Sequence, residues 1–198
     1  RFPGGTGSNF YNPFTGFFDD NSPSTRDYSD HNNRIKQFTD GKGRTPEAWL
    51  QWVKDHDVHY SLVLNVCTQT FEQNSRWIEE LGRGGHKVAR IEIGNEVFYS
   101  GYKWAFASGE EYVERAKKLT AVIRKELPET EVGVLVPTQL YQNSNFLDDD
   151  RPSSLNHQYG WIKALKGQTF FDAVVMHVYS LTRMDNNTKP ADFIPHID

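Results

Sequence analysis

The chain has 198 residues, of which 37% are hydrophobic and 14% aromatic, and its formal net charge is −4 with a pI of about 6.0. This length and apolar content suit one domain with a buried core. Nothing indicates a nucleic-acid-binding protein, because basic residues form no run and the pI lies far below the value of about 9 typical of such domains. The apolar stretches are of strand length, well short of the roughly 20 residues that span a membrane, so no membrane span is expected.

The cysteine content and the first residue narrow the interpretation further. The chain has one cysteine, Cys67, which excludes an intrachain disulfide and a metal site built on cysteines. A buried thiol is a better interpretation than a nucleophile, because no Cys–His pairing is readable from the sequence. The chain begins with Arg1 rather than Met and shows no signal peptide, so we expect it to start inside a longer protein or after processing. The compartment stays open, with a secreted or cell-surface location favoured.

Residues 1–45 read as a strand stub at Arg1 followed by one long loop. The segment Gly4-Gly5-Thr6-Gly7 lacks the third glycine and the following helix of a dinucleotide fingerprint, and it therefore predicts a tight turn. A loop this long is uncommon in a compact domain unless it is functional. Two interpretations of its aromatic residues stay open: they line an ordered rim around a ligand, or they hold the loop to the body of the domain. These residues are Phe10, Tyr11, Phe14, Phe17 and Phe18.

The first two predicted helices follow this loop. One begins at Thr45-Pro46-Glu47, with Thr45 as its cap and the proline at the first helical position, and it ends near His56. The other begins with a capping box, in which Thr70 is followed three residues later by Gln73, and it ends near Leu81. Both starts rest on local capping chemistry.

Two further helices are predicted downstream. The longer one begins with a second capping box at Ser108 and runs to about Leu127. Its apolar stripe is Tyr112, Ala116, Leu119, Val122 and Ile123. The shorter one contains Trp161 and is capped by Ser153 or Ser154.

Strands alternate with these helices at intervals of roughly 35–45 residues, which is the pattern of parallel βαβ units. After the stub at Arg1, the predicted strands are 58–66, 87–93, 131–136 and 172–178. No linker or internal repeat divides the chain. The sequence therefore predicts one α/β domain over residues 1–198, built on a parallel sheet.

The most informative strand end is Ile93-Gly94-Asn95-Glu96. In parallel α/β folds, chemistry is usually placed at the carboxyl ends of the strands. Glu96, with the Asn95 amide beside it and aromatic residues at 98, 99, 102 and 104, is therefore a candidate general acid/base for work on a sugar. The alternative is a glutamate that caps the next element or faces solvent. Glu92 is a separate case, for which a buried and paired structural carboxylate is the interpretation.

A second candidate strand end is His177-Val178-Tyr179. His177 and Tyr179 are two residues apart and share a face of a regular strand. They either hydrogen-bond a catalytic carboxylate or a substrate hydroxyl, or pack against the loop above. We favour the first role because they are predicted to share a rim with Glu96. The acidic run 148–150 lacks the spacing of a calcium loop and is read as a solvated loop.

Two of these segments together resemble a known family. Arg1-Phe2-Pro3-Gly4-Gly5-Thr6 and Ile91-Glu92-Ile93-Gly94-Asn95-Glu96 are similar to motifs of the clan A glycoside hydrolases, toward the branch of α-L-arabinofuranosidases and heparanase-like β-glucuronidases. The family fold is a (β/α)8 TIM barrel. The resemblance implies a partial TIM barrel here, with strands two to six present and the first, seventh and eighth absent.

The resemblance also implies roles for particular residues. In the family, the glutamate of Gly-Asn-Glu is the general acid/base and the asparagine holds the sugar 2-hydroxyl, which implies these roles for Glu96 and Asn95. It likewise places Arg1, His177 and Tyr179 at the substrate or the nucleophile. The family nucleophile is a glutamate at the end of the seventh strand, which we expect beyond residue 198.

The expected function is thus a retaining glycoside hydrolase that acts on an oligo- or polysaccharide and needs no cofactor or metal. Its expected partners are the carbohydrate substrate and the remaining barrel strands, from the same longer protein or another chain. Two alternatives stay open: a non-catalytic carbohydrate-binding relative with the same barrel, and a metal-dependent α/β hydrolase. Loss of activity on substitution of Glu96 argues against the first, and activity that survives a chelator argues against the second.

Overall fold

Parallel strands form the centre of the computed structural model, which describes residues 1–19, 28–137 and 151–177. Within these ranges, the strands make a four-stranded sheet in the order β1-β2-β3-β4, and each neighbouring pair is parallel. The strands are β1 (Tyr60–Val63), β2 (Val88–Glu92), β3 (Glu131–Leu135) and β4 (Ala173–Val175). Because sequence neighbours are also parallel sheet neighbours, each connection must cross back over the sheet, and helices make these crossings. The predicted α/β fold is confirmed.

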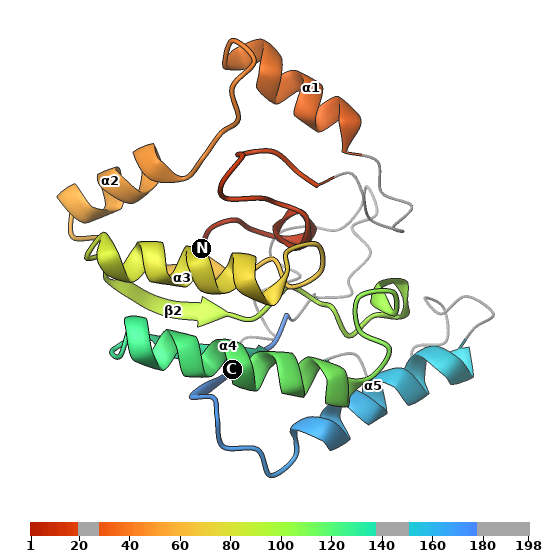
Figure 1. Ribbon diagram of the computed structural model, residues 1–198. Coiled ribbons are helices and arrows are strands. Elements are labelled where there is room, and N and C mark those ends of the chain that lie inside the picture. The colour runs from red at the N-terminus through yellow and green to blue at the C-terminus, as the bar shows by residue number, and fades with distance from the viewer. Residues whose placement is uncertain (20–27, 138–150, 178–198) are drawn as a thin grey trace, which may run out of the picture.

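The helices lie around this sheet and along the long N-terminal segment. The α-helices are α1 (Ser29–Phe38), α2 (Glu47–Asp55), α3 (Phe71–Arg83), α4 (Gly109–Glu126) and α5 (Arg151–Leu165), with two short 3-10 helices, η1 (Thr6–Asn9) and η2 (Ser100–Tyr102). Helices α3, α4 and α5 follow one another side by side, whereas α1 stands apart from them (Figure 1). The three crossover helices therefore form a continuous layer over the sheet.

The predicted strand stub at the start of the chain is present as an isolated parallel bridge between Phe2 and Leu62. The amide of Phe2 donates to the carbonyl of Ser61 at 2.9 Å, and the amide of Val63 donates to the carbonyl of Phe2 at 2.9 Å. These two bonds place the start of the chain next to β1, on the side of β1 that faces away from β2. The stub is shorter than a strand but occupies the position expected for one.

Residues 1–45 are not one loop, because α1 lies within them. The prediction missed this helix because its sequence is polar, and the buried residue that it contributes is Asn32 rather than an apolar stripe. The Asn32 side chain accepts from the amide of Phe18 at 2.9 Å and donates to the carbonyl of the same residue at 2.8 Å. Helix α1 is thus held by polar bonds to the segment before it.

Two of the helix starts follow the predicted capping chemistry. At α3, the Thr70 hydroxyl accepts from the amide of Gln73 and the Gln73 side chain accepts from the amide of Thr70, which completes the capping box. At α4, Ser108 accepts from the amide of Glu111 at 3.4 Å, but the Glu111 carboxylate accepts from the amide of Ala107 at 2.9 Å. The second box is therefore only half formed.

Two other predicted caps are wrong. At α2, Pro46 occupies the N-cap position with helical backbone angles, and no side chain caps the helix, so Thr45 lies outside it. Helix α5 begins at Arg151, which places Ser153 and Ser154 inside its first turns. Thr45 lies just outside α2, and the two serines lie inside α5. The presence of a residue that can cap a helix therefore does not determine at which residue the helix begins.

The strands are shorter than predicted, and β1 shows why. Val58, at the start of the predicted range, is 37% exposed and precedes the sheet. After β1, the Asn65 side chain accepts from the amides of Cys67 at 3.2 Å and Thr68 at 2.9 Å, which turns the chain. The apolar run 58–66 therefore contains a strand with a flanking residue at one end and a turn at the other.

The core lies between the sheet and the layer of crossover helices. Leu62, Ile91 and Val132 stand opposite one another on adjacent strands, and each is at most 1% exposed. From α4, the predicted stripe is confirmed for its fully buried members, Tyr112, Ala116, Leu119 and Ile123. Val122 is partly buried.

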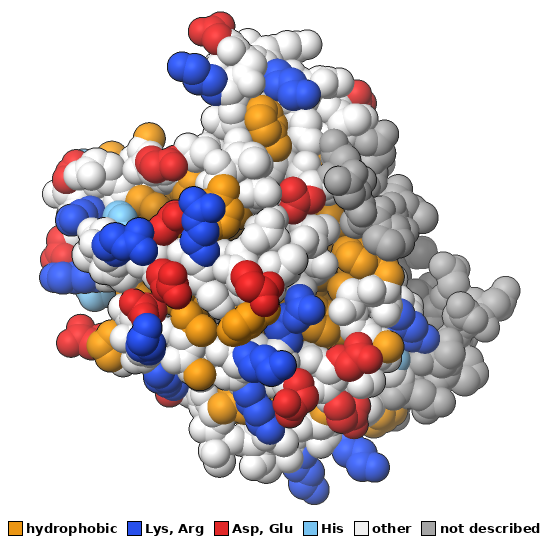
Figure 2. Space-filling model, viewed as in Figure 1, with side chains coloured by type: hydrophobic (Ala, Val, Ile, Leu, Met, Phe, Trp, Pro, Cys, Tyr) orange, Lys and Arg blue, Asp and Glu red, His pale blue; other side chains and the backbone are white. Residues whose placement is uncertain are grey.

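The outer surface of the helical layer is charged. Acidic and basic side chains alternate over the face that α3 and α4 present in Figure 2, with small apolar patches between them. Several pairs stabilise these helices locally, such as Arg76 with Glu80 one turn later at 2.9 Å. Among the helices of the described ranges, none has the length and apolar character that a membrane crossing requires.

Candidate active site

A sharp turn follows β2 at the carboxyl edge of the sheet. Gly94 has φ 90° and Glu96 has φ 52°, so both lie in the left-handed region. Gly94 is required there because a Cβ atom would stand 2.8 Å from Cγ2 of Val66. A glutamate in this conformation is uncommon and costs about 1–2 kcal/mol. The strand ends at Glu92, so Glu96 does not continue its alternation of sides.

Asn95, inside this turn, is held by two residues from the start of the chain. Its side-chain oxygen accepts from Nη2 of Arg1 at 3.0 Å. Its backbone amide donates to Oδ1 of Asn9 at 3.0 Å, and its carbonyl accepts from Nδ2 of Asn9 at 2.6 Å. Asn95 is 1% exposed and Asn9 is fully buried. Sequence reasoning missed Asn9, because a polar residue in a Gly-rich turn carries no pattern that predicts such a contact.

Glu92 is the buried, paired carboxylate that the sequence predicts. It is 6% exposed, and its Oε2 lies 2.6 Å from Nη2 of Arg1. The same guanidinium nitrogen contacts Asn95, so Arg1 joins the last residue of β2 to the turn beyond it. Glu92 is therefore committed to an ion pair within the fold.

Glu96 contacts a residue shortly after the end of β4, two strands away from β2 in the sheet. Its Oε1 lies 2.9 Å from Nδ1 of His177, and the two side chains are 14% and 17% exposed. Since β3 lies between β2 and β4, His177 reaches across one strand to make this contact. The predicted hydrogen bond between His177 and a candidate catalytic carboxylate is present, whereas Tyr179 lies outside the described residues.

A buried tyrosine supports the turn from beneath. The hydroxyl of Tyr112 donates to the carbonyl of Ile93 at 2.9 Å and accepts from the amide of Leu135 at 3.1 Å. It thereby joins the ends of β2 and β3 directly before the turn. Burial raises the pKa of this hydroxyl, which therefore stays protonated. The sequence marks Tyr112 only as a member of an apolar stripe, and the hydroxyl's role has no sequence signal.

The aromatic residues near Glu96 serve mainly the core. Phe98 is 3% exposed and packs edge-on against Trp161. Tyr99 is partly buried, and burial together with the nearby Glu96 carboxylate raises the pKa of its hydroxyl. Tyr102 belongs to η2 and packs near Phe10. The cluster therefore stiffens the segment after the turn, and its rings are not all turned to a ligand.

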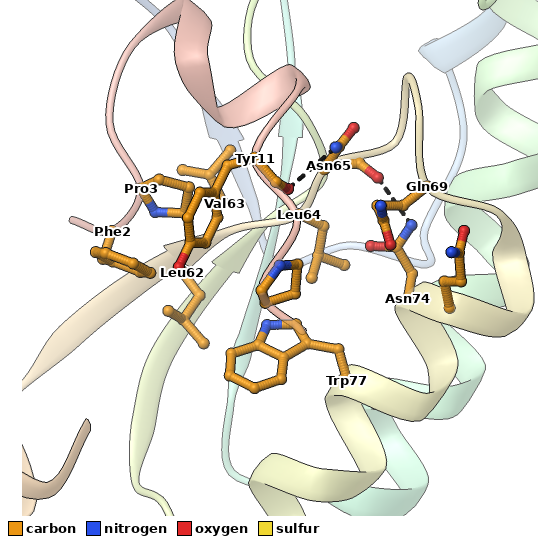
Figure 3. A pocket seen from close by; sticks show the side chains of 12 residues that line it. Phe2, Pro3, Tyr11, Leu62, Val63, Leu64, Asn65, Gln69, Asn74 and Trp77 are labelled. Atoms are coloured by element: carbon orange, nitrogen blue, oxygen red, sulfur yellow. Dashed lines mark hydrogen bonds between the residues drawn. The ribbon is translucent and has the colours of Figure 1, made fainter. Parts of the chain in front are cut away.

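The N-terminal segment is tied to the sheet beside this turn. The Asn65 side chain donates to the carbonyl of Tyr11 at 3.1 Å, and the Asn74 side chain donates to the carbonyl of Asn65 at 2.9 Å (Figure 3). Phe10 is fully buried and Tyr11 is 7% exposed. For these two aromatic residues, the interpretation that they hold the segment to the body is confirmed.

The cavity in Figure 3 is packing space rather than a ligand site. Its volume is about 10 Å³, which holds one water molecule at most. Pro3, Leu64 and Trp77 are among the residues around it. Its position between the N-terminal segment, β1 and α3 shows how closely the first residues dock on the sheet.

The predicted site residues therefore divide into two contacting pairs and one residue that is not described. Arg1 contacts Asn95, Glu96 contacts His177, and Tyr179 lies beyond the described ranges. Cys67 is partly buried, and burial raises the pKa of its thiol, as expected for an unreactive cysteine. Within the described part of the chain, no three His, Cys, Asp or Glu side chains are grouped so as to hold a metal ion.

Comparison with known proteins gives a likeness in structure alone. No family model matches the sequence, and no curated protein matches it. A solved α-L-arabinofuranosidase from Thermotoga maritima, in complex with arabinose, is 18% identical, with a TM-score of 0.49, over 70% of this chain and 31% of its own. A GH51 α-L-arabinofuranosidase from Thermotoga petrophila RKU-1 gives the same values. This chain thus spans about a third of the length of these structures, and the likeness assigns no role to any residue.

Proposed function

We propose that this chain is part of a retaining glycoside hydrolase that acts on an oligo- or polysaccharide, with Glu96 as the general acid/base. The observation that carries the proposal is the placement of Glu96: a strained turn at the carboxyl end of β2 presents it, and His177 contacts it across the sheet. Strain of this kind persists where surrounding contacts hold it, and it is concentrated at functional sites. The order of the stub and β1 to β4 fits strands two to six of a (β/α)8 barrel.

In this mechanism Glu96 acts twice. It first gives its proton to the glycosidic oxygen as the bond to the leaving group breaks, and it then takes a proton from the water that attacks the glycosyl-enzyme intermediate. His177, with Nδ1 protonated, donates to the Glu96 carboxylate after the first transfer and holds its orientation. The short separation of 2.9 Å suits such a bond.

Asn95 is proposed to bind the sugar 2-hydroxyl. Arg1 already donates to its Oδ1, which fixes the amide with Nδ2 as the remaining donor. Within the described residues, no group accepts a hydrogen bond from this nitrogen. Because Asn9 fixes the backbone of Asn95 on both sides, the amide is positioned before substrate binds.

The retaining mechanism needs a second carboxylate about 5–5.5 Å from the first. Glu92 does not suit the role, because it is buried in an ion pair with Arg1. We place the nucleophile on a strand beyond residue 198, supplied by the same longer protein or by another chain. Arg1 then serves to position Asn95, and Tyr179 extends the site beside His177.

The test is a leaving-group series on the full-length protein. Hydrolysis of aryl glycosides is measured for the wild type and for Glu96→Ala, with leaving groups from good to poor. Loss of the acid should lower kcat/KM, which reports the first step, by about 100- to 10,000-fold for poor leaving groups and far less for good ones. Glu131→Gln, an exposed glutamate at the opposite edge of the sheet, is the matched control and should keep wild-type rates.

Four results would contradict the proposal. Values of kcat/KM for Glu96→Ala that fall equally for all leaving groups, or not at all, exclude an acid catalyst at this position. Inversion of the anomeric configuration, followed by NMR of the product, excludes the retaining mechanism. Binding of carbohydrate without any hydrolysis indicates a non-catalytic relative, and activity that disappears with a chelator indicates a metal-dependent hydrolase.

A further inference from the structure

A polar pocket of about 300 Å³ opens at the same edge of the sheet as Glu96. This volume is at the lower end of the range for small-molecule sites. Three segments form its wall: the N-terminal segment, the stretch from β1 through the first turn of α3, and the loop after β2. The lining residues are Asn12, Asp19, Cys67, Thr68, Gln69, Gln73 and Trp104. None of the residues assigned to the hydrolytic step is among them, so the pocket is a separate feature.

Asp19 is the organising residue of this pocket. Its Oδ2 accepts from the Thr68 hydroxyl at 2.8 Å and from the Gln69 side-chain amide at 2.7 Å. Its Oδ1 accepts from the Asn12 side chain at 3.3 Å. Donors from two separate segments thus hold one carboxylate in place, and the remaining capacity of its oxygens is preorganised for a further donor.

Two enclosed polar atoms at this pocket have no partner among the described residues. Gln69 is 3% exposed, and its Oε1 makes no hydrogen bond to a described residue. The orientation of the amide is fixed, because the Asp19 carboxylate can only accept and so requires the Gln69 nitrogen. The indole nitrogen of Trp104 is likewise enclosed without an acceptor. Such groups destabilise a fold when they are left unsatisfied, which calls for an explanation. A ligand hydroxyl can donate to the Gln69 oxygen or accept from the Trp104 nitrogen once the side chain concerned turns that atom toward the pocket, since solvent reaches neither atom in this structure.

The charge of the pocket restricts the ligand. Among the lining residues, Asp19 carries a charge and no Lys or Arg is present. Burial raises the pKa of the Cys67 thiol, which therefore stays neutral. A uronic acid or a sulfated sugar would bring a second negative charge against Asp19 without a cation in the lining to balance it, because Arg115, which acts on Cys67, lies outside the lining. A neutral polyhydroxylated unit meets no such penalty.

We propose that this pocket binds a neutral sugar unit of the substrate, next to the unit held at Glu96, and that it selects neutral over acidic glycans. The proposal rests on the proposed function and deepens it. The two sites are joined through the N-terminal segment, since Asn9 binds Asn95 and the same segment supplies Asn12 and Asp19. We expect a substrate of several units to contact both.

The main test is oligosaccharide binding by calorimetry in a Glu96→Gln background of the full-length protein, which prevents hydrolysis. The probes are xylo-, arabino- and cello-oligosaccharides of two to five units, with oligogalacturonides as the acidic series. At least one neutral series should gain about tenfold in affinity when the chain extends into the pocket, and Trp104→Phe, which removes the indole N–H together with part of the ring system, should abolish most of this gain. Trp52→Phe, an exposed tryptophan on α2, is the matched control and should bind as the parent does.

The outcomes distinguish this proposal from the function on which it rests. The pocket assignment is overturned if Trp104→Phe and Trp104→Ala both bind the longer neutral chains as tightly as the Trp52→Phe control. It is also overturned if the acidic series binds as well as the neutral ones, or if no series gains affinity with length. Because binding is measured without turnover, a failure of Glu96 as the acid/base leaves these results readable.

Cys67 offers a second measurement that does not depend on a variant's folding. Methyl methanethiosulfonate should modify its thiol slowly, and the modified peptide can be followed by mass spectrometry. A neutral oligosaccharide that occupies the pocket should slow the modification severalfold, while the same concentration of oligogalacturonide should not. Equal modification rates with and without the neutral oligosaccharide would contradict occupancy of the pocket.

Discussion

Polar side chains gather at both ends of the strands, but they have different roles at the amino ends and at the carboxyl ends. At the amino edge, the Thr130 hydroxyl donates to the carbonyl of Val88 at 2.8 Å, and the Asp172 carboxylate accepts from the amide of Val132 at 2.7 Å. Arg124 donates to both oxygens of Asp172 at 2.6 and 2.7 Å. Each of these polar groups joins adjacent strands or a strand to its helix. This edge stabilises the fold.

At the carboxyl edge, polar groups instead hold a turn that the backbone disfavours. Gly94 and Glu96 are left-handed, and the turn is fixed by contacts of Asn95 with Asn9 and Arg1 and of Glu96 with His177, all from residues far away in the sequence. The difference follows the general division of parallel α/β folds, in which the carboxyl ends of the strands carry chemistry and the amino ends carry stability. Variants at the two edges should therefore separate activity from stability.

The largest expected effect is that of Gly94→Ala, which strikes the turn itself. An alanine at φ 90° costs about 1–2 kcal/mol, and its Cβ at 2.8 Å from Val66 adds about 1–3 kcal/mol of overpacking. Denaturant unfolding should show a loss of about 2–5 kcal/mol, together with loss of hydrolysis. The matched control is Gly41→Ala, which has φ 80° but open space, and should lose only about 1–2 kcal/mol. Equal losses for both variants would contradict the steric argument.

Tyr112→Phe tests the support beneath the turn. It leaves the buried amide of Leu135 without its acceptor, which should cost about 1–3 kcal/mol in unfolding free energy. Because the same hydroxyl holds the carbonyl of Ile93, activity should fall as well. Tyr159→Phe, an exposed tyrosine on α5, should change stability by less than about 0.5 kcal/mol. If Tyr112→Phe changes neither quantity, the hydroxyl does not position the turn.

Glu92→Gln tests whether the ion pair of Glu92 with Arg1 serves the fold or the reaction. Arg1 would lose its charged partner. Because the Arg1 side chain is 31% exposed, the unfolding free energy should fall by about 1–2 kcal/mol rather than by the larger value of a fully buried pair. Catalysis should change only as far as Asn95 shifts. Glu131→Gln, whose partner Arg90 is well exposed, should have no measurable effect on stability. A loss of activity as complete as that of Glu96→Ala would argue that Glu92 takes part in the reaction.

Asp172→Asn should have the smallest effect, and it is confined to stability. Burial alone would raise the pKa of Asp172, but hydrogen bonds from the Val132 amide and Arg124 outweigh it and lower the pKa. A depressed folded-state pKa contributes stability that is present above the unfolded value of about 3.9 and is lost as the pH falls through the folded value. The variant should therefore lose less than about 1 kcal/mol at pH 7, since both side chains are well exposed, and match the wild type at strongly acidic pH.

Urea unfolding followed between neutral and strongly acidic pH measures this difference. Hydrolysis at neutral pH should stay at the wild-type level, because Asp172 lies at the edge away from Glu96. A variant that loses activity without losing stability would reverse the assignment of the two edges.

The sequence predicted the parts of the fold that local chemistry determines. The alternation of helices and strands, the capping box at Thr70 and the apolar stripe of α4 all rest on residues close together in the chain, and the structure contains them. The contact of His177 with Glu96 was predictable for another reason: parallel strands bring their carboxyl ends to one edge, so residues that end two such strands meet there.

What the sequence did not predict is polar and long-range. Helix α1 buries an asparagine instead of an apolar stripe, so it has no hydrophobic period to find. Asn9 and the contact of Asp19 with Gln69 lie in segments without a regular pattern, and they gain their meaning only when distant segments meet. Side-chain amides carry such contacts without any spacing rule, which is why pattern analysis does not detect them.

The two hydrogen bonds between Asn9 and the backbone of Asn95 have a consequence for the order of folding. The contacts at the carboxyl edge join residues 81 to 94 positions apart, whereas β1 pairs with β2 across a single helix. Contacts that close long loops form late, because the entropy of loop closure must be overcome first. The sheet should therefore assemble before its first residues dock, and Asn9 should be synthesised long before its partner emerges. Hydrogen exchange at the Asn95 amide should accordingly report an opening that leaves the strands intact.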